Sequence, residues 1–191
     1  MKIIGIDLGT KCGISMLDMT KDITVCRTAA FNFARKQYGM QFHAFSDELH
    51  NFLKAHRSPK TYVFFEDVKA HSSNAAAHMY GYYRGALQRE CFMQGIQCIG
   101  IGVGTIKKTV AEKGNASKEE VAAGVEGLLD FAAIPLVLFS TNVRRPYYPL
   151  KIDSLTNDQT DSIAIAWTGM EMILGELPAK DSSDPTRKVV F

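Results

Sequence analysis

The stretch KIIGIDLG at residues 2–9 decides the fold. Its first six residues form a short, strongly apolar run that ends on the carboxylate of Asp7, and Gly9 follows. Short apolar runs bounded by turn residues are typical of β-strands. We therefore predict a first strand that presents Asp7 where it ends.

Two more strands and a helix are expected next. Residues 13–19 and 23–30 have the pattern of strands with a short connection, so the first three strands should form an antiparallel meander. Over residues 37–56 the apolar side chains recur at helical spacing. That helix provides a crossover, so the apolar strand at residues 62–65, which ends on Glu66, can run parallel to an earlier strand.

The second half of the chain is predicted to be mostly helical. Ser117 and Glu120 form a capping box at the start of one helix. Gly81 and Gly85 lower the helix propensity of another, which indicates close packing against the sheet or a partner. The expected elements are helices over residues 74–94, 104–111, 117–129 and 158–174, and a strand over residues 97–101. The fold class is therefore α/β, a mixed central sheet of about five strands flanked by helices.

Composition indicates one globular domain. The chain has 191 residues, of which 46% are hydrophobic and 22% charged. We assign residues 1–177 to a single domain and residues 178–191 to a polar, flexible tail. The formal net charge of +2 allows a nucleic-acid partner without implying one, because binding depends on where the charges lie.

The cysteines and the hydropathy pattern indicate a cytoplasmic protein. The four cysteines lack CxxC spacing, which is typical of buried thiols in a reducing compartment. The N-terminal residues do not resemble a signal peptide. No apolar run approaches the roughly 18 residues that span a bilayer, so we expect no membrane partner.

Four carboxylates fall where such a sheet could gather them. Asp7 and Glu66 end the first and fourth strands, and these ends share an edge of the sheet if the strands are parallel neighbours. Asp158 and Asp161 are three residues apart on a helix, so they share a face. Clustered carboxylates repel one another unless cations such as Mg²⁺ or Mn²⁺ bind them, and two such ions can hydrolyse a phosphodiester. Singly, each acid is as well explained as a solvated cap, so only the set of four predicts a site.

The residues also resemble a known family. The segments IIGIDLGTKCGISM, FFEDVKAHSSNAAAHMYGYYRGAL, GVGTIKKTVAEKGNASKEEV and NDQTDSIAIAW are similar, in order and spacing, to the motifs of RuvC-type Holliday junction resolvases. The resemblance covers the chain from Met1 to about Thr168. It implies an RNase H-like fold, a homodimer, two Mg²⁺ ions per active site, and cutting of four-way junctions and other branched DNA in recombination, repair or replication.

The same resemblance assigns roles to individual residues. Asp7, Glu66, Asp158 and Asp161 match the four catalytic and metal-binding carboxylates of the family. Lys118 matches a lysine near the scissile phosphate, which implies stabilisation of charge in the transition state. The residues assigned to DNA binding are Lys69, Lys107, Lys108, Lys113, Arg144 and Arg145.

This sequence departs from the family at two places. Lys69 stands where bacterial members commonly carry an aromatic residue that engages a base, and the loop at residues 140–157 is longer than expected. Both departures favour a broader activity on branched DNA, as in phage-type members.

Three other functions remain open. A different RNase H-like nuclease, acting on RNA–DNA hybrids or in RNA processing, would use the same carboxylates. A catalytically silent DNA-binding relative would not need all four. IGIDLGTKCG also resembles the first phosphate loop of actin-like ATPases, but those enclose the nucleotide between two such domains, and this chain is too short for both.

Overall fold

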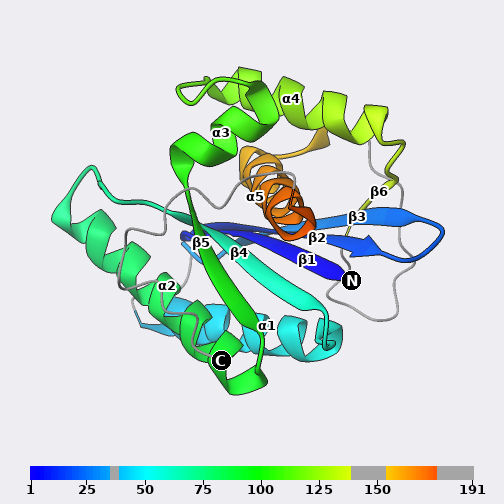
Figure 1. Cartoon of the computed structure of the whole chain (residues 1–191). Coiled ribbons are helices and arrows are strands. Elements are labelled where there is room, and N and C mark those ends of the chain that lie inside the picture. Colours follow the sequence, from blue (N-terminus) through cyan, green and yellow to red (C-terminus); the bar gives the residue numbers. More distant parts are fainter. Residues whose placement is uncertain (35–38, 139–153, 176–191) are drawn as a thin grey trace.

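The computed structural model describes residues 1–34, 39–138 and 154–175. Six strands form one sheet in the order β5-β4-β1-β2-β3-β6. The strands are β1 (Lys2–Asp7), β2 (Lys11–Met19), β3 (Thr24–Asn32), β4 (Thr61–Asp67), β5 (Gln97–Gly102) and β6 (Leu136–Leu138). The helices are α1 (Met40–His56), α2 (Asn74–Gln94), α3 (Val103–Ala111), α4 (Lys118–Phe131) and α5 (Asn157–Leu174). Figure 1 shows α1 and α2 on one face of the sheet and α3, α4 and α5 on the other.

The predicted α/β class and strand directions are confirmed. β1 pairs antiparallel with β2 and parallel with β4, and β2 pairs antiparallel with β3. The sheet of about five strands is confirmed with six, and the strand that the sequence did not indicate is β6, which pairs with β3 over only three residues, too few to show a period of two. The predicted start of α1 at residue 37 lies outside the described residues, as do residues 139–153 and the proposed tail at residues 178–191.

Alternation along the strands divides the core into two layers. Ile4 and Ile6 of β1 pack with the cluster that contains residues of α1 and α2. Ile3 packs with the cluster that contains residues of α4 and α5. Successive side chains of a strand point to opposite faces, so residues 3, 5 and 7 of β1 share the α5 face of the sheet.

Helix α5 lies directly on the sheet because glycines leave it room. A Cβ atom on Gly5 would overlap backbone atoms of Ser162 and Ala166, and one on Gly13 would overlap the carbonyl oxygen of Asp158. A larger residue at position 5 or 13 would therefore push the start of α5 away from β1 and β2.

The two glycines of α2 have a different surrounding. A Cβ on Gly81 or Gly85 would have no heavy atom of the described chain within 4 Å. The suggestion that these glycines allow packing against the sheet is wrong, since both lie on the open side of the helix. A partner outside the chain is the alternative that remains.

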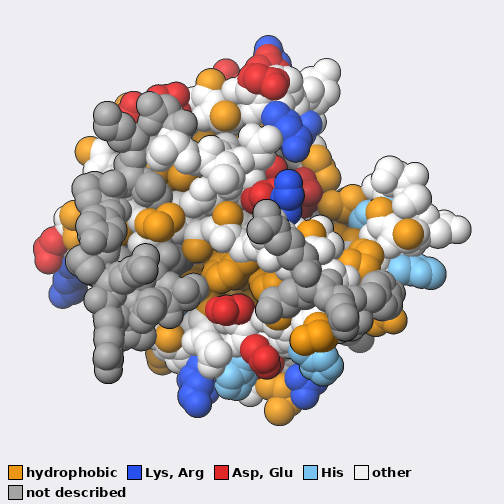
Figure 2. All heavy atoms as spheres, turned by 180° about the vertical axis from the view of Figure 1, so that it is seen from behind, with side chains coloured by type: hydrophobic (Ala, Val, Ile, Leu, Met, Phe, Trp, Pro, Cys, Tyr) orange, Lys and Arg blue, Asp and Glu red, His pale blue; other side chains and the backbone are white. Residues whose placement is uncertain are grey.

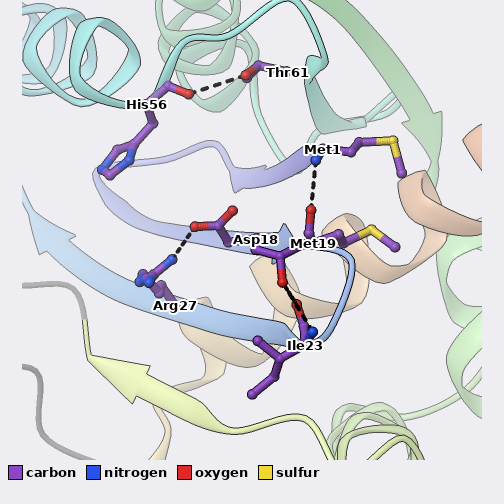
Figure 3. A network of polar contacts seen from close by, with 8 residues as sticks. Met1, Asp18, Met19, Ile23, Arg27, His56 and Thr61 are labelled. Atoms are coloured by element: carbon purple, nitrogen blue, oxygen red, sulfur yellow. Dashed lines mark hydrogen bonds and ion pairs between the residues drawn. The ribbon is translucent and has the colours of Figure 1, made fainter.

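The opposite end of the sheet, where β1 begins, is held by polar contacts (Figure 3). The Met1 ammonium donates to the carbonyl of Met19 at 2.8 Å, and Arg27 forms an ion pair with Asp18 across β2 and β3. Burial, together with the charges of Lys2 and Arg27, lowers the pKa of His56, nearby, to about 4. These contacts stabilise the end of the sheet farthest from Asp7.

Among the described residues, no helix is both long and apolar enough to cross a membrane. Cys12, Cys26 and Cys91 are free and buried, and Cys98 is free and half-buried, as the sequence predicted.

Candidate active site

Asp7 and Glu66 lie side by side on the α5 face of the sheet. The parallel register pairs Ile6 with Phe65, so Asp7 and Glu66 are the next residues along the two neighbouring strands. Asp7 shares its face with Ile3, and Glu66 shares its face with Phe64, which belongs to the same core layer. The carboxylates of the two strands therefore face the start of α5.

Helix α5 begins at this edge of the sheet. Thr156 caps it, with its hydroxyl accepting from the Gln159 amide at 3.3 Å and the Gln159 side chain returning to the Thr156 amide. Asp158 and Asp161 follow in the first turns, both half-buried.

Buried hydroxyls fix the rotation of α5 on the sheet. Ser162 Oγ lies 2.6 Å from Ser15 Oγ of β2, and Ser15 donates to Thr28 of β3 at 2.9 Å. All three side chains are fully buried. Because a buried hydroxyl is costly to leave without a partner, these contacts favour one position of α5 on the sheet. They therefore also set the position of Asp161, the residue before Ser162.

Among the four acids of the site, Asp7 is the one whose negative charge is most disfavoured by its surroundings. Burial raises its pKa to about 7, and the charges of Asp161, Glu66 and Asp158 contribute to the rise, while Lys118 opposes it. The structure thus brings the four predicted carboxylates within electrostatic reach of one another.

The positive charges of Lys107 and Lys118 partly offset the negative charges of the acids. Burial raises the pKa of Glu66, as does the charge of Asp161, whereas Lys107 and Lys118 lower it. Burial also raises the pKa of Asp161. The charge of Lys118 lowers this pKa, as does that of Lys107, whereas the charge of Asp158 raises it. Both lysines therefore lie near the same carboxylates.

The donor chemistry of this cluster fits a divalent cation. Partly buried carboxylates with mutually raised pKa values are stabilised by a hard cation, which accepts oxygen ligands. In the parts of the chain that the structure describes, no three His, Cys, Asp or Glu side chains are grouped so that they could hold a metal ion. The backbone brings the four acids together, and their side chains would have to turn toward a shared ion.

The remaining basic residues have separate positions. Lys107, on α3, donates to the Ala116 carbonyl at 2.6 Å, which holds its ammonium beside the start of α4. Lys113 is paired with Glu120 at 2.6 Å. Lys108 is exposed, and Lys69 is exposed in the segment after β4. Arg144 and Arg145 lie outside the described residues.

Sequence reasoning missed the residues that support the site. Tyr80 of α2 donates to the Glu66 carbonyl, and Ser15 and Ser162 join α5 to the sheet. A serine within the apolar runs GISM and DSIAIAW was the available signal, since a polar residue in a buried run needs a partner.

Comparison with known proteins agrees with this arrangement. A family model described as crossover junction endodeoxyribonuclease RuvC matches residues 3–139, which include Asp7, Glu66 and the four lysines 107, 108, 113 and 118. Asp158 and Asp161 lie beyond the matched range. No curated protein matches the chain.

Two solved structures resemble nearly the whole chain. Thermus thermophilus RuvC is 23% identical, covers 92% of this chain and 97% of its own, and superposes with a TM-score of 0.66. T. thermophilus RuvC in complex with Holliday junction substrate is 22% identical, with 92% and 96% coverage and a TM-score of 0.67. At these identities the likeness shows the fold, which is RNase H-like. Because the family model spans more than half of the sequence, the chain belongs to the RuvC family of crossover junction endodeoxyribonucleases.

Proposed function

We propose that this protein is a structure-selective endonuclease that resolves four-way DNA junctions by metal-dependent hydrolysis of phosphodiester bonds. The observation that carries the proposal is the gathering of Asp7, Glu66, Asp158 and Asp161 at one edge of a RuvC-type sheet, where burial and mutual repulsion raise the pKa of Asp7 to about 7. Carboxylates whose pKa values are perturbed by burial and by one another are typical of functional sites, and a divalent cation would relieve their repulsion.

The four carboxylates would hold two Mg²⁺ ions, with Mn²⁺ as a substitute. Asp7 is central, because the other three acids all act on it. Bound divalent cations supply an activated water and a Lewis acid for the leaving oxygen. The protein would contribute negative oxygen ligands from the ends of β1 and β4 and the start of α5, and the apolar layer beneath them would limit the access of bulk water.

Lys118 is proposed to stabilise the negative charge that develops on the phosphate. The proposal is supported by the charge of Lys118, which lowers the pKa values of Asp7, Glu66 and Asp161. Lys107 acts on Glu66 and Asp161 and has its ammonium held by the Ala116 carbonyl. Fixed cations of this kind contribute to phosphoryl-transfer catalysis without reorganising.

The DNA backbone would be held by basic residues around the site. On the face drawn in Figure 2, basic and acidic side chains of the described residues are interspersed in small groups. Binding therefore depends on local contacts, for which we propose Lys69, Lys107, Lys108 and Lys113, with Arg144 and Arg145 from the segment outside the described residues. Such contacts release counterions, so the affinity should fall with salt.

We also propose a homodimer, since two cuts in one junction require two sites. The open side of α2 is the proposed interface. It carries Gly81 and Gly85 with free space around them and the exposed side chains of Tyr82, 57% exposed, and Phe92, 67% exposed. Small residues beside exposed aromatic side chains allow two helices to approach closely.

The test compares a synthetic four-way junction with a flap, a linear duplex and an RNA–DNA hybrid, each with Mg²⁺, for the wild type and for Asp7→Asn. We expect paired, symmetric nicks in the junction, little cutting of the duplex, and no cutting by the variant. Cleavage of the hybrid alone would replace the proposed substrate, and full activity of Asp7→Asn would overturn the proposed site.

A further inference from the structure

Tyr80 holds the end of β4 through one hydroxyl group. The Tyr80 hydroxyl donates to the carbonyl of Glu66 at 2.6 Å and accepts from the amide of Val68 at 3.3 Å. Its ring lies against His71, with 4.8 Å between the ring centroids. A single side chain of α2 therefore contacts three residues of the segment that carries Glu66.

The two backbone groups that Tyr80 binds lie on the same side of the chain. In an extended strand, the carbonyl of one residue and the amide of the residue two positions later point the same way, which is how a neighbouring strand binds both. The pairing of β4 with β1 ends at Phe65 and Ile6. Beyond that pair, the Tyr80 hydroxyl satisfies the backbone groups of Glu66 and Val68, which would otherwise depend on water.

A second residue of α2 holds the same strand end. Arg84, one helical turn after Tyr80, forms an ion pair with Asp67 at 3.0 Å, and its guanidinium lies 5.5 Å from the centre of the Phe65 ring. Alternation directs Asp67 toward α2 and Glu66 toward α5. The backbone between them is therefore held from the α2 side while the Glu66 carboxylate faces the site.

We infer that Tyr80 is a positioning residue for the nuclease reaction, which fixes the Glu66 carboxylate by binding the backbone on either side of Asp67. The inference rests on the proposed function, in which Glu66 is a metal ligand. Tyr80 does not touch the reacting atoms.

The chain offers two matched controls on the same helix. Tyr83 is fully buried, and among the described residues its hydroxyl has no hydrogen-bond partner. Tyr82 is 57% exposed. Tyr80→Phe, Tyr83→Phe and Tyr82→Phe each remove one oxygen from a tyrosine of α2, but only the first removes a contact with the Glu66 backbone.

The first measurement uses the full-length, metal-free protein. Hydrogen exchange should become faster at the Val68 amide in Tyr80→Phe and stay unchanged in Tyr83→Phe and Tyr82→Phe. The second measurement titrates Mg²⁺ in the junction-cleavage assay. Loss of a group that orients a metal ligand typically weakens metal binding by about 10–100-fold, so Tyr80→Phe should need at least ~10-fold more Mg²⁺ for half-maximal cleavage. Junction binding in Ca²⁺ should remain that of the wild type.

Two results would overturn the inference. One is a wild-type Mg²⁺ requirement in Tyr80→Phe; the other is a fall in maximal rate with no change in that requirement, which indicates a structural role. Glu66→Gln separates this failure from a failure of the proposed function. If Glu66→Gln abolishes cleavage while Tyr80→Phe behaves as the wild type, only the inference fails; if Glu66→Gln keeps the wild-type Mg²⁺ requirement, both fail.

Discussion

Replacing Gly13 with alanine should separate α5 from the sheet and displace two of the carboxylates. The backbone of Gly13 does not have a positive φ, so alanine is conformationally allowed there. The added Cβ, however, would overlap the carbonyl oxygen of Asp158 and lie 3.0 Å from Ser162 Oγ. The obstacle is backbone at the start of α5, which cannot rotate away as a flexible side chain can.

The size of the effect follows from that overlap. Inserting a methyl group into a packed contact typically costs about 1–3 kcal/mol, and the upper end applies here because backbone must move. For a chain of this size, that loss lowers the melting temperature by roughly 5–10 °C. A carboxylate displaced by about 1 Å should reduce cleavage on the order of 100-fold.

Gly127→Ala is the matched control. Gly127 lies inside α4, and a Cβ there would have no heavy atom of the described chain within 4 Å. Alanine in a helix interior is about 0.5–1 kcal/mol more stable than glycine, so this variant should melt slightly higher and cleave normally. Calorimetry and single-turnover cleavage measure both variants. A Gly13→Ala protein that melts and cleaves as the wild type does would refute the close contact between α5 and β2.

Three further outcomes follow from the same geometry. The raised pKa of Asp7 means that folding favours its protonated form, so Asp7 destabilises the metal-free protein increasingly as the pH rises from about 4 to about 7, by at most about 4 kcal/mol. Urea unfolding in the presence of a chelator should therefore find Asp7→Asn more stable than the wild type at about pH 8, and the two proteins nearly equal in stability at about pH 4. Equal stability at about pH 8 would contradict the burial of a charged cluster. Lys118→Ala should lower the maximal cleavage rate by about 100-fold or more, and a defect in junction binding alone would exclude Lys118 from the reaction. Lys108→Ala should instead weaken junction binding and reduce the salt dependence of binding, which titrations at several salt concentrations measure. Gly85→Arg should fold normally, because the space beside Gly85 is open, yet sediment as a monomer and lose paired cutting, and an intact dimer would exclude this face of α2 as the interface.

Much of the fold could be predicted because its signals are local. The run KIIGID, the helical spacing before His56 and the capping box at Ser117 each reflect neighbouring residues, and the structure confirms the elements that they predicted. β6 could not be found in this way, since three residues carry no period and the strand depends on its pairing with β3.

The residues of the candidate site could be predicted from the sequence better than the contacts that hold them in place. The sequence put Asp7 and Glu66 at the ends of two strands that share an edge if they are parallel neighbours, and the register shows that they are. The contacts that support them join different elements: Tyr80 of helix α2 reaches the backbone of Glu66 on β4, and Ser15 meets Ser162 across 147 positions of sequence. No periodicity in the sequence reports such pairs, because each residue alone fits an ordinary helix or strand.

A crystal structure of the protein grown with Mn²⁺ would test the central claim most directly, because the anomalous signal of manganese locates the ion without reference to activity. We expect manganese within coordination distance, about 2.0–2.3 Å, of carboxylate oxygens of Asp7 and of at least two among Glu66, Asp158 and Asp161, whose side chains turn toward it. Manganese bound only elsewhere on the protein, or a Mn²⁺-dependent nuclease whose four carboxylates bind none, would contradict the claim that these acids form the metal site.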